Sequence, residues 1–431
     1  MLKNRLLLVF LFVFIDLLGY SLFLPLLPYY AGSLGATSAL TGILIASNAL
    51  AQLLATPVIG RLSDRFGRRP LLILSISGTL GSFVLLALVE PLGSSLVSAL
   101  GGRLALGSAT LTMLFLSRIL DGLFGGDVSL ARAYITDITD ENNRAKGLGM
   151  IGAAFGLGFI VGPAIGGTLA NWSYLTAPFA SLGLSRYAVP AVAAALLSAL
   201  NLVAVVMWLP ESLPAEERAR LSESPRAAFS ARCLWDCVTR PRFATLLRLR
   251  LLYMLAFTLF TANFALWAGY HLRLSDQTTS YVLTYVGILV VLVQGVAMGR
   301  LTATISEPRL IVAGTLLLAA TLFAWAFVPN LALLLVVVTP LPLAGGTLNT
   351  VTNSSMTKSV YREEVGGALG LSASLDSLAR VIAPAVAGFL LQGVGASFIG
   401  LLAASLAGLA FLFAWRRLLV RPDPALPGRA A

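Results

Sequence analysis

Residues 41–89 read TGILIASNALAQLLATPVIG, RLSDRFGRR and PLLILSISGTLGSFVLLALV, so a short basic loop joins two long apolar runs. A helix needs about 20 apolar residues to cross the hydrocarbon core of a bilayer, and each run has that length. Four of the nine loop residues are arginine. This stretch therefore predicts two transmembrane helices with a positively charged connection on one side of the membrane.

The same alternation of apolar runs and polar connections continues in both directions along the chain. Hydrophobic residues make up 58% of the sequence and charged residues 11%, whereas soluble domains carry about 25% charged residues. The predicted spans lie near 6–27, 41–60, 70–89, 110–132, 147–169, 188–209, 248–270, 279–299, 309–328, 331–353, 366–391 and 395–415. The sequence thus predicts an all-α membrane protein with twelve transmembrane helices in two six-helix bundles.

The domain boundaries follow from these spans. We expect an N-terminal bundle at 1–209, a charged linker at 210–247, a C-terminal bundle at 248–415 and a tail at 416–431. A short surface helix is expected in the linker around Cys233 and Cys237. Two cysteines predict neither a disulfide framework nor a metal site.

The distribution of lysine and arginine predicts the orientation. With a cytoplasmic N-terminus, 25 of the 30 basic residues lie in or beside cytoplasmic segments, including six arginines of the linker and Arg248 and Arg250 at the start of the seventh span. Three lie in outer loops and two within spans. Basic residues accumulate on the cytoplasmic side, so both termini are expected there. Because the charges sit in short loops, the net charge of +11 is not interpreted as nucleic-acid binding.

An internal repeat supports two related halves. The loop that begins at Gly60 has a counterpart that begins at Gly299, each directly after the second span of its half. Gly149 and Pro163 in the fifth span are spaced like Gly370 and Pro384 in the eleventh. Paired repeats of this kind are typical of secondary transporters.

Charged residues inside predicted spans need an explanation, because each costs at least about 2.5–3.5 kcal/mol near the bilayer centre. The six that lie away from the ends of the spans are Asp16, Arg118, Asp121, Asp127, Asp376 and Arg380. Spacing along the helix suggests the pairs Arg118–Asp121 and Asp376–Arg380. Each pair could simply neutralise itself, and Asp16 could pair with Arg118 across helices. Otherwise Asp16 is available to take up and release protons or to bind substrate, while Asp127 could simply reach water near the cytoplasmic end of its helix.

The fifth span is rich in glycine. Gly158, Gly162 and Gly166 recur every fourth residue, and Pro163 and Gly167 lie beside them. Small residues on one face allow membrane helices to pack closely. Two interpretations are open, namely static packing or a pliable contact between the two halves, and the bend at Pro163 favours the second.

These motifs resemble those of the major facilitator superfamily, and within it the twelve-helix drug/proton antiporters, closest to the tetracycline/proton exporters and their eukaryotic relatives. The resemblance is carried by residues 10–170. It rests on the loop Gly60–Pro70, on Arg118 with Gly122, on Gly158–Gly167, and on Asp16-x-x-Gly19 followed by Pro25 and Pro28.

The resemblance implies an inner gate in the loop after the second span. Asp64 would meet the N-terminus of the eleventh span, where the helix dipole favours an anion. Arg65, Arg68 and Arg69 would bridge to an acid near the inner end of the fourth span, with Asp137 as the expected partner. The gate motif comprises Gly60, Asp64, Arg65, Gly67, Arg68, Arg69 and Asp137. The arginines could instead only set orientation and touch anionic lipid.

The resemblance also implies alternating access around a central site lined by spans 1, 4, 7 and 10. In the second half it suggests Asn263, Trp267 and Asn349 as cavity residues. The excess of acids favours a cationic or amphiphilic substrate that exchanges for protons. The membrane could be a plasma membrane or an organelle membrane, and a monomer is sufficient for this architecture. The alternatives are a uniporter or symporter for a metabolite such as an organic anion, bound by Arg118 and Arg380, and a non-transporting receptor or scaffold. No cofactor is expected, and no nucleophile–histidine pairing, nucleotide loop or metal cluster suggests an enzyme.

Overall fold

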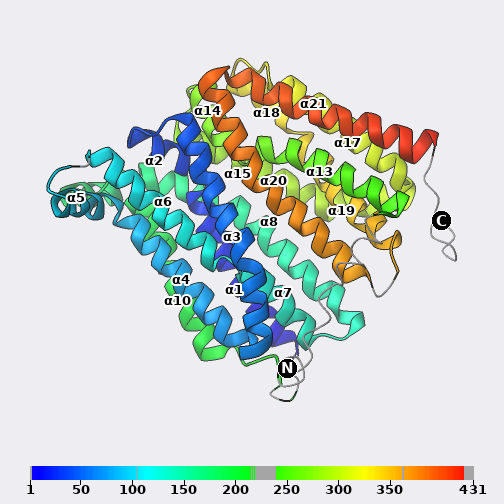
Figure 1. Ribbon diagram of the computed structural model, residues 1–431, viewed down its shortest axis with the longest axis horizontal. Coiled ribbons are helices and arrows are strands. Elements are labelled where there is room, and N and C mark those ends of the chain that lie inside the picture. Colours follow the sequence, from blue (N-terminus) through cyan, green and yellow to red (C-terminus); the bar gives the residue numbers. More distant parts are fainter. Residues whose placement is uncertain are drawn as a thin grey trace. The chain divides into compact units, whose positions relative to one another are not determined.

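The computed structural model describes residues 2–103, 105–214, 216, 218, 239–361 and 364–421 (Figure 1). These residues form helices and contain no strand. Twelve helical segments are long and apolar enough to cross a membrane. The prediction of an all-α, twelve-span membrane protein is therefore confirmed.

The first six spans contain eight helices, and two short helices, α5 (Val89–Ala99) and α9 (Ser173–Ser181), follow the third and fifth spans. The spans are α1 (Leu2–Phe23) with α2 (Leu27–Ser33), α3 (Ser38–Phe66), α4 (Arg68–Ala87), α6 (Leu106–Phe124) with α7 (Asp127–Ile138), α8 (Glu141–Asn171) and α10 (Ala188–Trp208).

The last six spans are built in the same manner. They are α13 (Pro241–Thr261) with α14 (Phe264–His271), α15 (Asp276–Leu292) with the π-helix η1 (Val293–Ala297) and α16 (Met298–Thr304), α17 (Glu307–Trp325), α18 (Leu331–Val338) with α19 (Leu341–Lys358), α20 (Val365–Gly393), and α21 (Ala396–Ala414) with the π-helix η3 (Trp415–Val420).

Spans 1, 4, 7 and 10 are each broken into two helices, whereas the sequence predicted four continuous runs. The breaks lie around Pro25, at Gly125–Gly126, at Ala262–Asn263 and at Thr339–Pro340. Proline and glycine at three of these breaks explain them, since proline removes a backbone donor and glycine weakens the helix. Broken helices expose backbone polar groups inside the membrane, which membrane proteins tolerate where protein or water satisfies those groups.

Two predicted boundaries are wrong. Helix α13 begins at Pro241, so the seventh span starts before residue 248 and takes the end of the predicted linker. Proline fits the first turn of a helix, where its missing N–H has no partner to lose. Helical structure continues to Val420, so the predicted tail loses residues 416–420. The expected surface helix around Cys233 and Cys237 lies outside the described residues.

The chain packs as two compact units. The first comprises Met1–Arg226 and Arg273–Ile288, and the second comprises Ala227–Leu272 and Leu289–Ala431. The first part of α15 therefore packs with the first unit, although it follows α14 in sequence.

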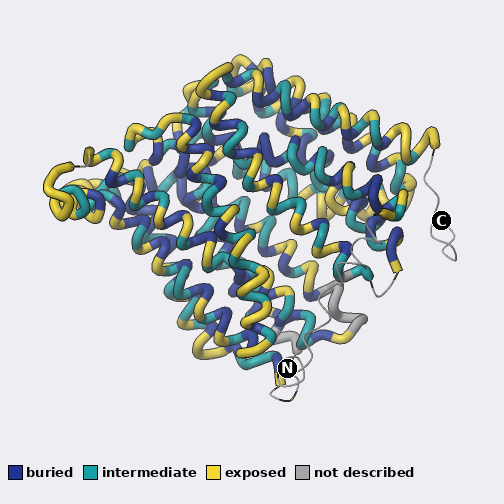
Figure 2. Tube along the Cα trace, in the orientation of Figure 1, coloured by how far each residue is buried: buried dark blue, intermediate teal, exposed yellow. Residues whose placement is uncertain are grey.

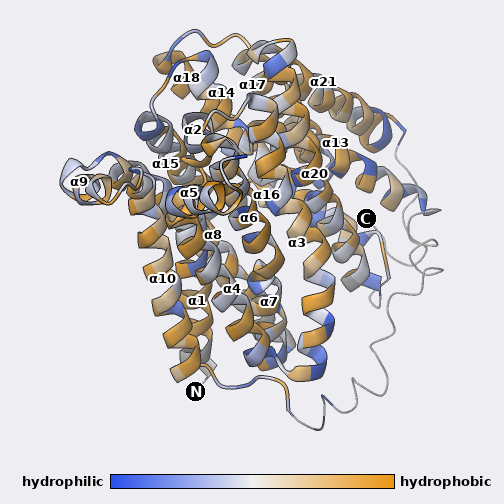
Figure 3. Cartoon of the chain, turned by 60° about the vertical axis from the view of Figure 1, so that its left-hand side comes forward, coloured by the Kyte–Doolittle hydropathy of each residue, from blue (hydrophilic) through white to orange (hydrophobic). Residues whose placement is uncertain are grey.

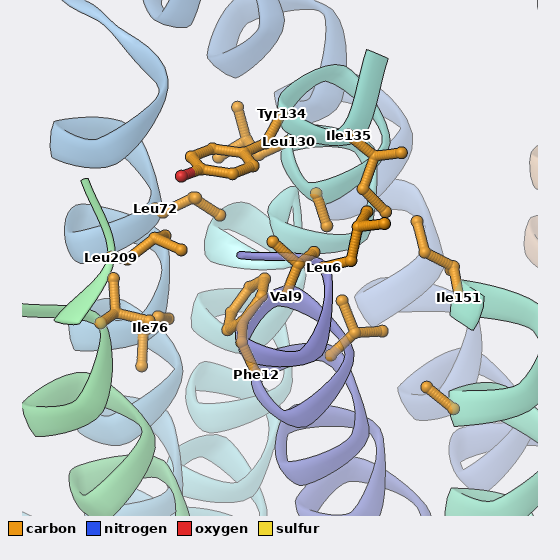
Figure 4. Packing of buried hydrophobic residues seen from close by; sticks show 14 of the residues in the cluster. Leu6, Val9, Phe12, Leu72, Ile76, Leu130, Tyr134, Ile135, Ile151 and Leu209 are labelled. Atoms are coloured by element: carbon orange, nitrogen blue, oxygen red, sulfur yellow. The ribbon is translucent and has the colours of Figure 1, made fainter. Parts of the chain in front are cut away.

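One core cluster of the first unit lies along the first part of α1. Leu6, Val9 and Phe12 pack there against Leu72 of α4 and Tyr134 of α7 (Figure 4). In a water-soluble protein, burial of each such side chain stabilises the fold by about 1.5–3 kcal/mol. In a membrane, where lipid is also apolar, close packing between helices provides the stabilisation instead. The core thus holds α1 against α4, α7, α8 and α10.

The core of the second unit is aromatic. The rings of Trp267 and Trp325 lie 4.8 Å apart, and the ring of Phe260 lies 4.9 Å from Trp325. These three side chains are almost fully buried. Edge and tilted contacts of this kind stabilise aromatic clusters beyond their burial, and this cluster ties α13 and α14 to α17.

The outer surfaces of the helices are apolar rather than charged. On α10, the side chains of Leu196, Leu200, Val203 and Met207 are 50–66% exposed and recur on one face. Exposed positions recur along the helices in Figure 2, and Figure 3 shows apolar residues over most of the length of α3 and α10. Lipid tails are the solvent that suits such a face.

Candidate functional site

Three acidic side chains gather in the first unit. Asp16 lies on α1, Asp121 on α6, and Asp127 is the first residue of α7. The carboxyl groups of Asp16 and Asp127 lie close enough to interact, and Asp121 is also near Asp16. Asp127 is almost fully buried. Two neighbouring carboxyl groups can share a hydrogen bond only when one of them carries a proton.

The break between α6 and α7 positions Asp127. Because α7 begins at Asp127, the carboxylate lies at a helix N-terminus, and its Oδ1 accepts a hydrogen bond from the backbone N–H of Val128 at 2.7 Å. Free N–H groups and the helix dipole stabilise an anion there. The expectation that Asp127 simply reaches water is wrong, because its side chain is buried beside Asp16.

Arg118 and Asp121 form the predicted pair on α6. Their closest nitrogen and oxygen atoms are 3.4 Å apart, and both residues are buried. Two neutral donors also reach Asp121: Asn48 of α3 at 2.9 Å and Ser82 of α4 at 3.2 Å. Asp121 is therefore a shared acceptor for three helices.

Arg118 is only partly satisfied by this pair. Its Nη2 atom has no hydrogen-bond partner in the described part of the chain. The guanidinium carbon lies 5.9 Å from the ring centres of Phe23 and Phe83, within range of a cation–π interaction. Arg118 thus retains a free donor in the interior of the first unit.

The predicted pair Asp376–Arg380 is wrong. Asp376 of α20 binds Arg250 of α13 through two contacts, from Nε to Oδ1 at 3.0 Å and from Nη2 to Oδ2 at 2.7 Å. Arg380 is exposed. A guanidinium and a carboxylate bind strongly through two parallel contacts. Asp376 therefore pairs with Arg250 on another helix and not with Arg380, which lies one turn away on its own helix.

Arg250 is a site residue that the sequence analysis missed. It lies near the start of the predicted seventh span, 248–270, whereas the structure places it well inside α13, where it is 3% exposed. It also donates to Asn353 at 2.9 Å and to Asn349 at 3.4 Å. Pro241, a typical first-turn residue, is the signal that could have moved the start of this span.

The three suggested cavity residues separate into two groups. Asn263 and Trp267 are fully buried in this structure, and their role as cavity residues stays a prediction. Asn263 donates to the backbone oxygen of Ala383 at 3.4 Å, and Trp267 packs in the aromatic core. Asn349 is exposed and contacts Arg250, as described above.

Arg68 is the centre of the loop motif after α3. It is 2% exposed and binds Asp64 at 2.7 Å, Asp137 at 3.0 Å and the hydroxyl of Ser63 at 2.5 Å. The expected ion pair with Asp137 is thus present. The expected contact of Asp64 with the eleventh span stays a prediction.

The other two arginines of the motif do not bridge to acids as predicted. Arg65 is exposed and lies 5.4 Å from the ring of Phe66. Arg69 donates from Nη2 to the backbone oxygen of Val206 at 2.6 Å. A side chain at Gly60, the first motif residue, would meet no atom within 4 Å.

Glu211 completes this cluster and was not foreseen. Its carboxylate accepts hydrogen bonds from the backbone N–H groups of Arg68 at 2.9 Å and Arg69 at 3.1 Å, at the start of α4. Gly67 before them has φ 105°, which disfavours other residues, and a Cβ there would collide with Glu211. The motif therefore requires glycine at this position for two reasons. The sequence held no signal for Glu211, which is distant in the chain.

The glycine stripe of α8 packs within the first unit. A side chain at Gly158 would lie 3.1 Å from Leu17, and one at Gly162 or Gly166 would collide with Ser21 or Leu22 of α1. The Ser21 hydroxyl also donates to the Gly158 oxygen at 2.7 Å. The preferred interpretation as a contact between the halves is therefore wrong for these three glycines. Gly167 differs, because it faces Ser280 of α15, and α8 continues through Pro163.

The start of α15 is held by polar contacts at the opposite end of the first unit. Asp276 is 2% exposed and binds Arg186 at 3.1 Å and Asn171 of α8 at 3.3 Å. Tyr29 of α2 contacts the hydroxyl of Thr279 at 2.6 Å. Burial raises the pKa of neighbouring Tyr187 to about 12, so its hydroxyl remains neutral and accepts a hydrogen bond from Arg186.

The loop before α17 repeats the arrangement around Arg68 with the opposite charge. Glu307, at the start of α17, accepts from Lys358 of α19 and from the hydroxyls of Ser354 and Ser355, each at 2.7 Å. The position that is basic in the first half is acidic in the second.

A hollow of about 380 Å³ lies between α3, α4 and α6. Its lining is apolar except for Ser75 and includes none of the acidic residues, so we assign no substrate to it. Within the described residues, no group of three or more His, Cys, Asp or Glu side chains is placed to hold a metal ion.

The sequence matches the family model described as Major Facilitator Superfamily over residues 9–292 and 246–431. The chain belongs to the major facilitator superfamily. It is thus a multi-pass integral membrane transporter rather than an enzyme, and the resemblance of its motifs is confirmed at this level.

Individual relatives extend over most of the chain. Human "Solute carrier family 67 member A1" is 29% identical over 398 residues, covering 91% of this chain and 87% of the relative. The class C tetracycline resistance protein of Escherichia coli is 29% identical over 401 residues, covering 89% of each. Among solved structures, the human organic anion transporter MFSD10 has a TM-score of 0.65 at 23% identity, over 96% of this chain and 99% of that one.

Proposed function

We propose that this transporter moves a small organic molecule out of a compartment in exchange for protons, by alternating access. The proximity of the Asp16 and Asp127 carboxyl groups supports this proposal most directly. A pair of carboxyl groups that shares one proton carries a charge of −1, and release of the proton changes this charge to −2. Such a pair can couple proton movement to a conformational cycle.

The neighbouring charges support the same proposal. Arg118 and Asp121 largely neutralise each other, so Asp16 and Asp127 remain as the excess acids among these four residues. A cationic or amphiphilic substrate would compete with the proton for this site, so loading one would expel the other. The names of the tetracycline and multidrug resistance relatives make tetracycline a reasonable first substrate to test.

The cycle itself remains part of the proposal. In it, the units formed around spans 1–6 and 7–12 rock about a central site, both termini face the cytoplasm, and the Arg68 cluster is part of an inner gate. The broken spans 1, 4, 7 and 10 provide the positions where helices can bend.

Proteoliposomes provide the test. Under an inward proton gradient, internal pH is followed while tetracycline or another amphiphilic cation is added. We expect substrate-dependent proton movement in the wild type and its loss in Asp16→Asn and Asp127→Asn. Glu90→Gln is the matched control, because Glu90 is an acid of the same unit that only accepts a hydrogen bond from Tyr30. Full proton exchange by Asp16→Asn would refute the proposal.

A second candidate is uniport or symport of an organic anion. Its support is the exposed Arg380 and the organic anion transporter among the structural neighbours, which establishes the fold alone. Substrate movement without proton flux in the wild type would favour this candidate.

A further inference from the structure

Helix α20 has two exposed sides of different character. Arg380 is exposed on one side, with Ser377 half-buried beside it, and Leu369 is exposed on the same side about three turns away. Leu378, Ile382 and Phe389 are exposed on the other side, by 38%, 40% and 58%. At 3.6 residues per turn, Ser377 lies about 60° from Arg380, whereas Ile382 and Phe389 lie about 160–180° away. The apolar side suits lipid, and the polar side requires another solvent.

The position of Arg380 along the helix excludes an approach to the membrane surface. It lies near the middle of α20 (Val365–Gly393), about 20 Å from either end at 1.5 Å per residue. An arginine side chain cannot extend so far, and a charge in lipid costs at least about 2.5–3.5 kcal/mol. The polar side of α20 must therefore face water inside the protein.

The neighbouring helix continues this polar surface. On α19, Asn349 and Thr350 are exposed and Asn353 is half-buried. Asn349 and Asn353 receive hydrogen bonds from Arg250, which also binds Asp376 one helical turn from Arg380. The surface thus spans two helices and is anchored by one buried ion pair.

The charge of this surface is positive. Arg250 and Asp376 neutralise each other through two short contacts. The Arg380 side chain makes no ion pair or hydrogen bond with any other described residue. None of its five guanidinium donors binds a described residue, and their geometry matches a carboxylate or a similar oxyanion.

We propose that Arg380 and the polar surface beside it form a subsite for an anionic group of the transported molecule. The proposal rests on the proposed function, because it assumes that this water-facing surface is part of the substrate pathway. It predicts a substrate class that carries an anionic group.

Binding to the purified full-length protein in lipid nanodiscs tests the subsite. Three probes share one ring system: 1-naphthoate is anionic, 1-naphthamide is neutral and 1-naphthylmethylammonium is cationic. We expect the wild type to bind 1-naphthoate more tightly than 1-naphthamide. Arg380→Gln should weaken 1-naphthoate binding about 10- to 100-fold and leave 1-naphthamide unchanged, because only the charged contact is lost. Arg380→Lys should retain part of the preference.

Arg309→Gln is the matched control, because it removes an exposed arginine of the same unit near the start of α17. It should bind all three probes like the wild type. The proposal is overturned if the wild type does not prefer the anion, or if Arg380→Gln weakens 1-naphthoate and 1-naphthamide equally.

Chemical accessibility tests the same surface without any ligand. In a chain with Cys233→Ser and Cys237→Ser, a charged methanethiosulfonate reagent should modify Arg380→Cys quickly in nanodiscs. It should leave Ile382→Cys, on the apolar side of α20, largely unmodified. Equal modification of both positions, or none at Arg380→Cys, contradicts the proposed water-facing side.

The two proposals fail separately. Binding in nanodiscs needs no proton gradient, so a failed anion preference leaves proton exchange through Asp16 and Asp127 in place. Conversely, loss of proton coupling without loss of anion preference would refute the proposed exchange mechanism and retain the subsite.

Discussion

At the scale of single residues, burial separates side chains that the sequence presents as equivalent. The loop after α3 contains four arginines, and their spacing does not reveal which one is central. The structure distinguishes them: Arg68 has three side-chain partners in the interior, whereas Arg65 is exposed. Removing one member of a buried pair leaves an uncompensated charge, which costs far more than losing a surface contact.

We therefore expect Arg68→Gln to lower the free energy of unfolding by about 3 kcal/mol, since Asp137 and Asp64 would lose their shared cation. Arg65→Gln in the same loop should change it by less than about 0.5 kcal/mol. Denaturant or thermal unfolding of the detergent-solubilised protein measures both variants. Equal losses would mean that the cluster around Arg68 does not stabilise the first unit.

The ion-pair partners show where residue-level prediction stops. Spacing along one helix correctly gave Arg118–Asp121 but incorrectly gave Asp376–Arg380, because Asp376 has a better partner on another helix. Contacts between distant segments, such as Glu211 with the start of α4, leave no local pattern in a single sequence. The types of charged residue in the spans were predictable, but most of their partners were not.

At the scale of elements, apolar length predicted the existence of each span, and local chemistry modified its course. Gly125–Gly126 and Pro340 were visible in the sequence but were not used to place breaks. The glycine stripe of α8 was recognised, but its partner helix was not predictable, because a small-residue face fits any neighbour. The structure shows that this neighbour is α1.

This contact predicts a large difference between two glycines of α8. Gly162→Ala should destabilise the protein by about 1–3 kcal/mol, because the new methyl group would collide with Ser21 and the backbone of Leu22. Gly152→Ala adds the same group where no atom lies within 4 Å, and it should be neutral or stabilising by up to about 1 kcal/mol. Thermal unfolding compares the two, and similar stabilities would argue against close packing of α1 on α8.

At the scale of the whole molecule, hydropathy alone predicted all twelve spans, because only a lipid environment accommodates so much apolar surface. The internal repeat was also visible, and the structure adds that the repeated loops use opposite charges. Arg68 binds Asp137 in the first half, whereas Glu307 binds Lys358 in the second. Related positions in the two halves thus both form an ion pair, but the basic and acidic partners are exchanged. A search for identical residues overlooks this relationship.

The orientation of the chain provides the last prediction. An even number of spans places both termini on the same side of the membrane. The loops of that side hold an excess of lysine and arginine, so we expect that side to be cytoplasmic. In a chain with Cys233→Ser and Cys237→Ser, single cysteines replace two exposed serines: Ser98 near the end of α5, and Ser306 between α16 and α17. A membrane-impermeant maleimide added to intact cells should label Ser98→Cys at once and Ser306→Cys only after lysis. The reverse pattern would invert the topology, and it would then assign the Arg68 cluster to the outer side of the membrane rather than to an inner gate.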